Sequence, residues 1–468
     1  MDYQEAAEFL LDLRRFGVSP GTESVRELLA ELGDPHEDMT VVQIAGSNGK
    51  GSTARMVESC LREAGYRVGL YTSPHLEDLR ERVRVDGRKV PRASVASFVE
   101  RAEPVLVERA ADGDPVTFFE AVTALALWRF DRADCDVAVL EVGLGGRYDA
   151  TSVADPVAAA VTNVSLEHTA VLGDTVEAIA AEKAAVAPAD RPLVTAATGD
   201  ALDALRDAVD DLVTVGEARA DADVAATYGG RTDTVEGRVE LDGPGWHVEA
   251  RLPLLGVCQA HNAGVAAVLA HQVADALDGP PVDSGTVERG LRGAHWPGRF
   301  EVVERAPLTV LDGAHNPGAC AATTATLAEF DPDALHVVFA AMHEKDHVGM
   351  VEALPAPDSV VTCAPTLDRA EDPAVLAAVW ERESDAGTVE AGDAVLDALR
   401  TARDRADDGD CVLVVGSLFA VAEARERWTR TVRPVAAGDG DAAAARARDA
   451  GAPATEVERV RERGASRT

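Results

Sequence analysis

Apolar positions between residues 39 and 196 follow two alternating patterns. Short β-branched runs with the composition of buried strands stand at 39–45, 67–73, 135–143, 157–164 and 191–196. Segments with helical spacing separate them, beginning with residues 50–64. Strands that alternate with helices are typical of a mostly parallel sheet with helices on both faces. The pattern therefore predicts a doubly wound α/β domain.

The pattern changes at residues 215–252, where short alternating runs and glycine-rich turns replace helical spacing. This change predicts a small antiparallel β insertion. A helical stretch at 258–278 follows, and Pro297 and Gly298 then mark a boundary near residue 295.

Beyond that boundary the alternation restarts, and strands are expected near 308–312, 335–340, 358–363 and 411–415. We therefore expect an N-terminal domain over 1–295, a smaller Rossmann-like α/β domain over 296–433, and a cleft between them. Residues 434–468 hold almost no large apolar side chain, which predicts a flexible tail with a short helix at 454–463.

The charge balance restricts the class of partner. The 468 residues include 81 acidic and 45 basic side chains, giving a formal net charge of −36. Such a surface repels nucleic acid and anionic membranes, so neither is an expected partner. Only four of the basic residues are lysines. This composition resembles that of proteins from salt-loving organisms, in which concentrated salt screens repulsion between carboxylates.

Cysteine spacing and hydropathy indicate a cytoplasmic protein. The six cysteines are scattered without a C-x-x-C pair, so neither a zinc cluster nor a disulfide framework is indicated. No apolar run reaches the roughly 18 to 20 residues that a membrane span needs, and the acidic first residues do not resemble a signal peptide.

A glycine-rich stretch between an expected strand and an expected helix is a candidate phosphate-binding loop. Its residues are Gly46, Ser47, Asn48, Gly49, Lys50, Gly51 and Ser52. Backbone N–H groups at such a helix start can bind phosphate oxygens, and Lys50 can reach the terminal phosphates. The spacing matches the common phosphate-loop pattern only loosely, and the alternative is a glycine-rich turn that binds nothing.

Glu141 ends an apolar strand just before a glycine turn, at the sheet edge where α/β proteins bind ligands. With Ser73 or Ser52 and a nucleotide, its carboxylate is a candidate Mg²⁺ ligand. The alternative is a glutamate that caps the turn.

Three further polar residues each have a structural alternative. His168 follows a strand and could be a hydrogen-bonded core histidine, while Lys183 lies in an alanine-rich helix and could reach solvent. Asp312 ends a strand before His315 and a proline-started helix. It could hold a ribose, position a reacting group or form an Asx turn.

Nine segments, taken in order, resemble the Mur ligase superfamily, and within it the folylpolyglutamate synthases and bifunctional dihydrofolate synthases. They are GSNGKGS (46–52), TSPHLEDLRERVRVDG (72–87), TFFEAVTALAL (117–127), EVGLGGRYDATS (141–152), TNVSLEHTAVLGDTVEAIAAEKA (162–184), HNA (261–263), PGRFE (297–301), LDGAHNP (311–317) and EKDHVGMVEAL (344–354). Three of the four lysines, Lys50, Lys183 and Lys345, fall in these segments.

The resemblance implies a reaction. ATP would phosphorylate the carboxylate of folate or dihydropteroate, and the amine of L-glutamate would attack the acyl phosphate. Lys50 would stabilise the transferring phosphoryl group. Ser73 and Glu141 would hold one Mg²⁺, His168 would contribute to a second, and Lys183 would be carbamylated. K⁺ is a further candidate cofactor, and family members usually work as monomers.

The resemblance also assigns the remaining site residues. Asn262 and Arg299 would contact ATP, and Asp312 and His315 would line the cleft, where domain closure excludes water. The substrate side would be formed by Pro74, His75, Arg82, Phe119, Glu120, Arg147, Asp149 and Ala150.

Departures from the family pattern leave the preferred pterin open. Cys258 precedes Gln259 where His is usual, Ser152 replaces Asn, and Ser47 replaces Thr. Two alternatives stay open. A peptidoglycan-type Mur ligase would usually place a substrate domain of ~100 residues before the loop, and only 45 residues precede Gly46. The other alternative is a non-catalytic nucleotide-binding protein of the same fold.

Overall fold

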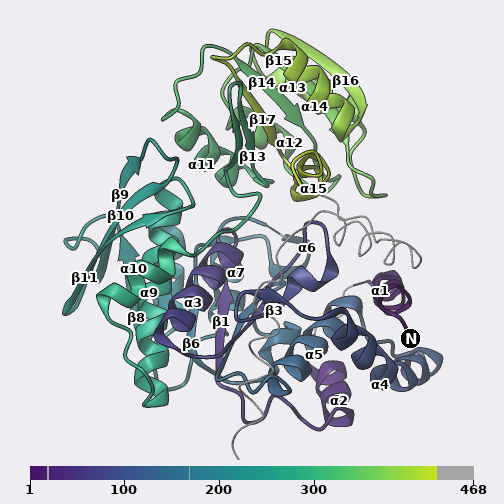
Figure 1. The fold of residues 1–468 in the computed structure, drawn as a ribbon, viewed down its shortest axis with the longest axis vertical. Coiled ribbons are helices and arrows are strands. Elements are labelled where there is room, and N and C mark those ends of the chain that lie inside the picture. The colour runs from purple at the N-terminus through teal and green to yellow at the C-terminus, as the bar shows by residue number, and fades with distance from the viewer. Residues whose placement is uncertain (18–20, 168, 430–468) are drawn as a thin grey trace, which may run out of the picture. The chain divides into compact units, whose positions relative to one another are not determined.

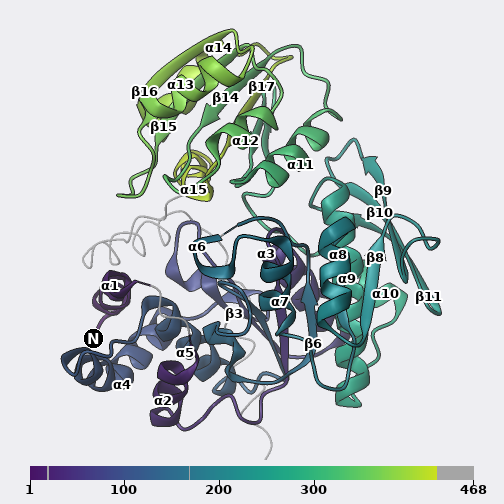
Figure 2. The same ribbon diagram turned by 180° about the vertical axis from the view of Figure 1, so that it is seen from behind.

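The structure is a computed structural model that describes residues 1–17, 21–167 and 169–429. The expectations for His168 and for the tail at 434–468 lie outside these residues. The described strands form two sheets, one of eleven strands and one of six. Figures 1 and 2 show both sheets with their helices.

The larger sheet has the order β11-β10-β9-β8-β7-β6-β1-β5-β2-β3-β4. Its strands are β1 (Val41–Ala45), β2 (Val68–Tyr71), β3 (Val83–Val85), β4 (Arg88–Lys89), β5 (Val137–Glu141), β6 (Pro156–Val161), β7 (Leu193–Thr195), β8 (Leu212–Gly216), β9 (Val224–Arg231), β10 (Gly237–Gly243) and β11 (Trp246–Leu252). Its helices are α1 (Tyr3–Asp12), α2 (Glu23–Glu31), α3 (Lys50–Ala64), α4 (Arg92–Ala111), α5 (Phe118–Asp131), α6 (Thr169–Leu172), α7 (Val176–Ala184), α8 (Gly199–Ala208), α9 (Val257–Leu277) and α10 (Ser284–Arg292), with 3₁₀ turns at Leu13–Phe16, Leu79–Arg82 and Ala150–Val153.

Side chains of the central strands alternate between two cores. On β5, Val137 and Val139 join the core under α3, α9 and α10, whereas Ala138 and Leu140 join the core under α1, α2, α4 and α5. Successive residues of a strand point to opposite faces, so a strand covered on both faces must be apolar throughout. The prediction of a doubly wound, mostly parallel sheet is confirmed.

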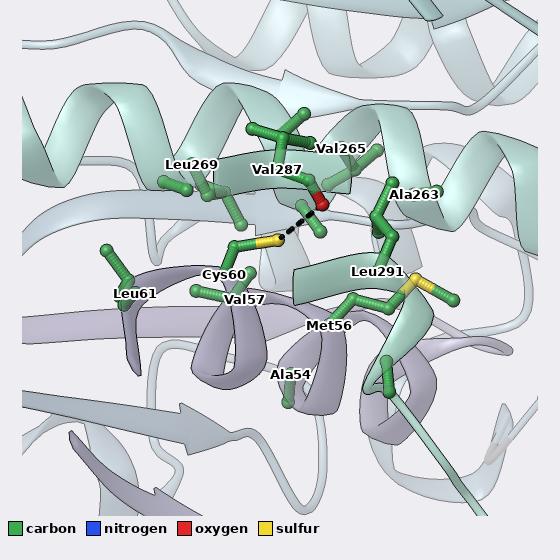
Figure 3. Packing of buried hydrophobic residues seen from close by; sticks show 14 of the residues in the cluster. Ala54, Met56, Val57, Cys60, Leu61, Ala263, Val265, Leu269, Val287 and Leu291 are labelled. Atoms are coloured by element: carbon green, nitrogen blue, oxygen red, sulfur yellow. Dashed lines mark hydrogen bonds between the residues drawn. The ribbon is translucent and has the colours of Figure 1, made fainter. Parts of the chain in front are cut away.

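The first core shows how closely the helices approach one another. Figure 3 shows Cys60 of α3 facing Val287 of α10, with its Sγ 3.8 Å from the Val287 carbonyl oxygen. A Cβ added at Gly290 would lie 2.5 Å from Cys60 Cα, so a side chain there would separate the two helices. This packing fixes α3, whose first residue is Lys50.

The segment expected as an antiparallel insertion at 215–252 contains three strands with antiparallel pairing. The parallel strand β8 continues to Gly216, and the antiparallel strands β9, β10 and β11 occupy 224–252. They extend the main sheet beyond β8 (Figure 1), because β8 and β9 pair in parallel at Val215 and Val224.

The smaller sheet has the order β12-β13-β17-β14-β15-β16. Its strands are β12 (Glu301–Arg305), β13 (Leu308–Leu311), β14 (Leu335–Phe339), β15 (Ser359–Ala364), β16 (Thr388–Ala394) and β17 (Cys411–Val415), and its helices are α11 (Pro317–Leu327), α12 (His347–Glu352), α13 (Pro373–Glu383), α14 (Val395–Arg405) and α15 (Leu418–Arg425). The four expected strands are β13, β14, β15 and β17. The edge strands β12 and β16 were not expected, because their residues are largely polar and partly exposed.

A buried polar trio joins three strands at the amino ends of the smaller sheet. His336 Nδ1 lies 2.8 Å from Ser359 Oγ, and His336 Nε2 lies 3.4 Å from Asp410 Oδ2. All three side chains are buried. Catalytic loops of α/β sheets lie at the opposite, carboxyl edge, so we assign this trio to stability.

His336→Ala is expected to lower the free energy of unfolding by about 2 kcal/mol, because it leaves Ser359 and Asp410 buried without their partner. Denaturant unfolding at fixed salt measures the effect. A change below about 0.5 kcal/mol, the size usual for exposed sites, would contradict this assignment.

No helix in the described part of the chain is long and apolar enough to cross a membrane.

Candidate active site

A cavity of about 1790 Å³ is lined by loops that follow strands of both sheets. From the larger sheet come the loops after β1, β2, β5 and β6, and from the smaller sheet the loops after β13, β14, β15 and β17. Each of these loops follows the carboxyl end of its strand, which is the edge where α/β sheets bind ligands.

The loop after β1 has a conformation that requires glycine. Gly46 has φ 139°, and a Cβ there would lie 1.9 Å from Thr162 Oγ1. Gly49 has φ 85°, and its Cβ would lie 2.6 Å from Asn262 Oδ1. L-residues rarely adopt such φ values. Both glycines therefore allow the backbone to approach its neighbours closely.

Asn163, two residues after the end of β6, holds this loop through two hydrogen bonds. Its backbone oxygen accepts a hydrogen bond from Ser47 N (2.9 Å), and its Oδ1 accepts one from Asn48 N (2.8 Å). Sequence reasoning missed Asn163, because the strand expected at 157–164 included it, whereas β6 ends at Val161.

Lys50 and Ser52 begin α3 directly after this loop. Lys50 Nζ donates to the backbone oxygens of Gly46 (2.8 Å) and Ser47 (3.1 Å). Ser52 Oγ is buried and has no hydrogen-bond partner within the described residues. A buried hydroxyl without a partner is costly, so an oxygen-binding cation or a phosphate oxygen would fit at this position.

Glu141 lies beside the loop because β1 and β5 pair in parallel with Ile44 opposite Glu141. Glu141 Oε2 accepts a hydrogen bond from Ser73 N (2.7 Å), and a Cβ added at Gly51 would lie 3.3 Å from Oε1. Burial raises the pKa of Glu141 above its ordinary value, while Lys50 and the Ser73 N–H oppose the rise. A cation at this carboxylate would relieve the cost of burying it.

Among the described residues, no three His, Cys, Asp or Glu side chains gather closely enough to hold a metal ion. A cation here would therefore need ligands from hydroxyl groups and from the nucleotide, as Mg²⁺ commonly has.

Lys183 reaches the same loop from α7. Its Nζ donates to Gly46 O (3.1 Å) and to Glu167 Oε1 (3.0 Å), and its side chain is buried. Burial and the nearby Lys50 lower the pKa of Lys183 to about 8, although Glu167 acts in the opposite direction. The helix therefore turns this lysine inward, away from solvent.

The loop after β13 brings Asp312 and His315 to the cavity. Asp312 Oδ1 accepts from Ala314 N (3.0 Å) and Oδ2 from Thr323 Oγ1 (2.9 Å), so its carboxylate also orders its own turn. His315 Nδ1 donates to Gly313 O (2.8 Å). Burial and Lys345 lower the pKa of His315 to about 4, so the ring is neutral and its Nε2 is an acceptor.

A reciprocal amide pair joins the phosphate loop to the smaller sheet. Asn316 Nδ2 donates to Asn48 Oδ1 (2.9 Å), and Asn48 Nδ2 donates to Asn316 Oδ1 (3.3 Å). Asn316 also caps the first turn of α11 through Ala319 N. Asn316 was not among the expected site residues. Near it, Arg299 lines the cavity and donates from Nη1 to Gly298 O (3.1 Å).

A stacked cationic group forms another part of the wall. The guanidinium carbons of Arg82 and Arg14 lie 5.0 and 4.8 Å from the centre of the Phe118 ring. Arg82 Nε donates to His75 Nδ1 (2.9 Å), and burial together with Arg82 lowers the pKa of His75 to about 3. Arg82 lines the cavity, whereas His75 lies behind it.

The other expected substrate residues divide into two groups. Pro74, Phe119 and Ala150 lie on the cavity wall, and Tyr148 joins them there, 57% exposed. Arg147 is not on the wall, and its Nε lies 3.7 Å from Glu182 Oε1.

Glu120 and Asp149 line the cavity, but their carboxylates are engaged locally. Glu120 completes a capping box with Thr117 at the start of α5 and also accepts from Ser24. Asp149 accepts from the backbone N–H groups of Gly143 (3.0 Å) and Leu144 (2.9 Å) and from Thr151. We assign both carboxylates to ordering their own loops.

Sequence reasoning also missed three cations on the wall: Arg14, Lys345 and Arg369. Burial lowers the pKa of Lys345. Lys345 stands in a quoted family segment, which was a signal. Arg14 and Arg369 stand outside those segments and carried no comparable signal.

Family models, relatives and solved structures show which proteins this chain resembles. The Mur ligase middle domain matches residues 44–270, and the Mur ligase glutamate ligase domain matches residues 298–418. A probable bifunctional folylpolyglutamate synthase/dihydropteroate synthase of Haloferax volcanii is 62% identical over 93% of this chain, which spans 51% of that relative. The chain thus spans about half the length of this relative.

Other relatives match over most of their length. The dihydrofolate synthase/folylpolyglutamate synthase of Escherichia coli is 34% identical, with 89% of this chain and 93% of the relative covered. The Mycobacterium tuberculosis folylpolyglutamate synthase structure complexed with ADP has a TM-score of 0.83 and 30% identity, covering 92% of this chain and 100% of the other. The chain therefore belongs to the dihydrofolate synthase/folylpolyglutamate synthase family of the Mur ligases.

Proposed function

We propose that this protein joins L-glutamate to a pterin-bearing acid, dihydropteroate or a folate, at the expense of ATP and through an acyl phosphate. The observation that carries the proposal is the grouping of three residues at one phosphate-type loop: Lys50, Ser52, whose buried hydroxyl has no partner among the described residues, and the buried Glu141 at the end of β5 beside the loop. The names of the relatives support the reaction type.

The nucleotide would bind with its phosphates on the loop at the start of α3. Backbone N–H groups and the helix N-terminus favour anions there. Lys50 would give up its two carbonyl contacts to pair with the transferring phosphoryl group. The ADP in the Mycobacterium tuberculosis structure supports nucleotide binding by this family.

Ser52, Ser73 and Glu141 would hold Mg²⁺, because they combine a hydroxyl that no other described residue engages, a second hydroxyl and a buried carboxylate. Bound Mg²⁺ would neutralise negative charge on the phosphates. His168 and a carbamylated Lys183 form the proposed second metal site, and Glu167 lies 3.0 Å from the Lys183 nitrogen.

The smaller sheet would complete the nucleotide site. Arg299 would neutralise phosphate charge, and Nε2 of the neutral His315 would accept a hydrogen bond from a ribose or an attacking amine. Asp312 would hold the turn that presents His315. Enclosure by loops of both sheets limits water, which would otherwise hydrolyse an acyl phosphate.

The acid would bind between the apolar wall and the cations. Phe119 and Tyr148 offer rings for a pterin, and Arg82 offers a positive charge at the same wall. Lys345 and Arg369, on the wall formed by the smaller sheet, would attract the carboxylates of L-glutamate.

Isotope transfer tests this proposal. The protein, in molar salt, is mixed with ATP, L-glutamate and dihydropteroate or a reduced folate whose carboxylate carries ¹⁸O. An acyl phosphate requires one labelled oxygen to leave with inorganic phosphate when the amide forms. Unlabelled phosphate alongside amide product would contradict the acyl phosphate, and the absence of amide with every acid would contradict the proposed function.

A further inference from the structure

Two neighbouring loops of the smaller sheet are joined by backbone pairing at the cavity wall. The first, residues 341–347, follows β14, and the second, residues 367–371, follows β15. His343 N donates to Arg369 O (3.1 Å) and Glu371 N donates to Ala341 O (2.9 Å), with an antiparallel bridge between Met342 and Ala370. We call these segments the loop pair.

Each loop of the pair carries one cation and one acid to the cavity wall: Lys345 and Glu344 on the first loop, Arg369 and Asp368 on the second. Lys345 and Arg369 both line it, and Arg369 Nη1 lies 3.9 Å from Glu344 Oε1 on the other loop. The ammonium group of Lys345 and the guanidinium group of Arg369 can each pair with a carboxylate of a ligand, in competition with the acids on the same loops. Binding of a carboxylate by Lys345 and Arg369 depends on how firmly the two loops are held in place.

Glu371 closes the loop pair on the side away from the cavity. Its Oε1 lies 3.1 Å from His343 Nδ1 and accepts from Asp372 N (2.9 Å), while its Oε2 lies 4.0 Å from His347 Nδ1. His347 Nε2 donates to Met342 O (2.9 Å), so the second histidine is itself hydrogen-bonded within the first loop. Neither Glu371 nor the two histidines line the cavity.

We propose that Glu371 is a positioning residue: tied to His343 and His347, it holds the loop pair so that Lys345 and Arg369 meet the carboxylates of the amino-acid substrate. This inference rests on the proposed function for the identity of that substrate. The carboxylate acts through the loops and touches no reacting atom. A cation displaced by about 1 Å loses much of its binding geometry.

Glu371→Gln tests the proposal, because it keeps the size of the side chain and removes its charge. The KM for L-glutamate is expected to rise about tenfold, with kcat and the KM for ATP unchanged within about twofold. Glu371→Asp keeps the charge and is expected to recover part of the loss. Glu381→Gln is the matched control, since Glu381 is an exposed residue of α13 that does not line the cavity.

A double-mutant cycle tests the link to the first loop. His343→Ala is expected to raise the KM for L-glutamate in the wild-type background and to add little to Glu371→Gln. Fully additive effects would overturn the proposed link, as would a wild-type KM in Glu371→Gln.

Hydrogen exchange of the ligand-free protein separates this inference from the proposed function. Amides of residues 341–347 are expected to exchange faster in Glu371→Gln than in the wild type or Glu381→Gln. Unchanged exchange would overturn the inference even if the protein ligates glutamate. If the protein has no ligase activity but exchange is faster in Glu371→Gln, the role of Glu371 in holding the loops would be supported. Only the proposed identity of the substrate would then be refuted.

Discussion

Glu141→Gln is expected to lower the kcat for ligation by about 10² to 10³ while leaving the fold intact. Glutamine keeps the shape of the side chain, and its amide oxygen can still accept from Ser73 N. The substitution removes a buried carboxylate, whose pKa is raised by burial. Without a cation this charge is costly, so its removal should not destabilise the ligand-free protein.

Two measurements check this prediction. Steady-state ligation at varied Mg²⁺ gives the loss in kcat, and thermal unfolding with and without Mg-ATP gives the stabilisation by bound nucleotide. The stabilisation by Mg-ATP should shrink in Glu141→Gln and persist in the exposed control Glu381→Gln. Turnover near that of the wild type would remove Glu141 from the metal site.

The central fold was predictable because burial on both faces leaves a direct trace in the sequence. Val137 to Leu140 are apolar without a break, since alternate residues enter two different cores. By contrast, β16 pairs with β15 along one edge only, and residues such as Glu390 and Asp393 remain exposed. Such a strand is held by its backbone pairing, so its sequence carries no apolar pattern.

The glycine turn after β1 was predictable for a similar reason, because its glycines meet a backbone requirement that is local in sequence. Asn163 and Asn316 escaped prediction because their partners are distant in sequence. Asn48 pairs with Asn163 across 115 positions and with Asn316 across 268. An amide side chain alone does not indicate which remote group it will meet.

Glu120 and Asp149, which were expected to contact the substrate, show that a local structural role can be overlooked. Glu120 stands three residues after Thr117, the spacing of a capping box, and a capping interpretation was available from the sequence. Asp149 similarly precedes Thr151 in a turn whose backbone N–H groups it accepts from. Where a local hydrogen-bond pattern explains an acid, that structural role competes directly with a role in binding.

Lys183→Ala is expected to lower ligation by at least about 10². Proposed carbamylation would convert the buried amine into an anion beside Glu167, and two adjacent anions form a cation site. Carbamate forms only from a neutral amine. Because the pKa of Lys183 is lowered to about 8, the reactive fraction falls below this pH and rises above it. At a fixed CO₂ concentration, wild-type activity should therefore rise as the pH passes through about 8.

Chemical rescue distinguishes a carbamate from a plain ion pair. A short carboxylate such as acetate can occupy the space left in Lys183→Ala and restore part of the activity, whereas Lys183→Arg, which keeps a cation near Glu167, should stay inactive. ¹³C-labelled bicarbonate should give the wild type a carbamate NMR signal that Lys183→Ala lacks. An active Lys183→Arg enzyme, together with a wild type that shows no carbamate signal, would show that Lys183 acts as an ammonium, as its 3.0 Å contact with Glu167 allows. The second metal site would then lose its proposed anionic ligand.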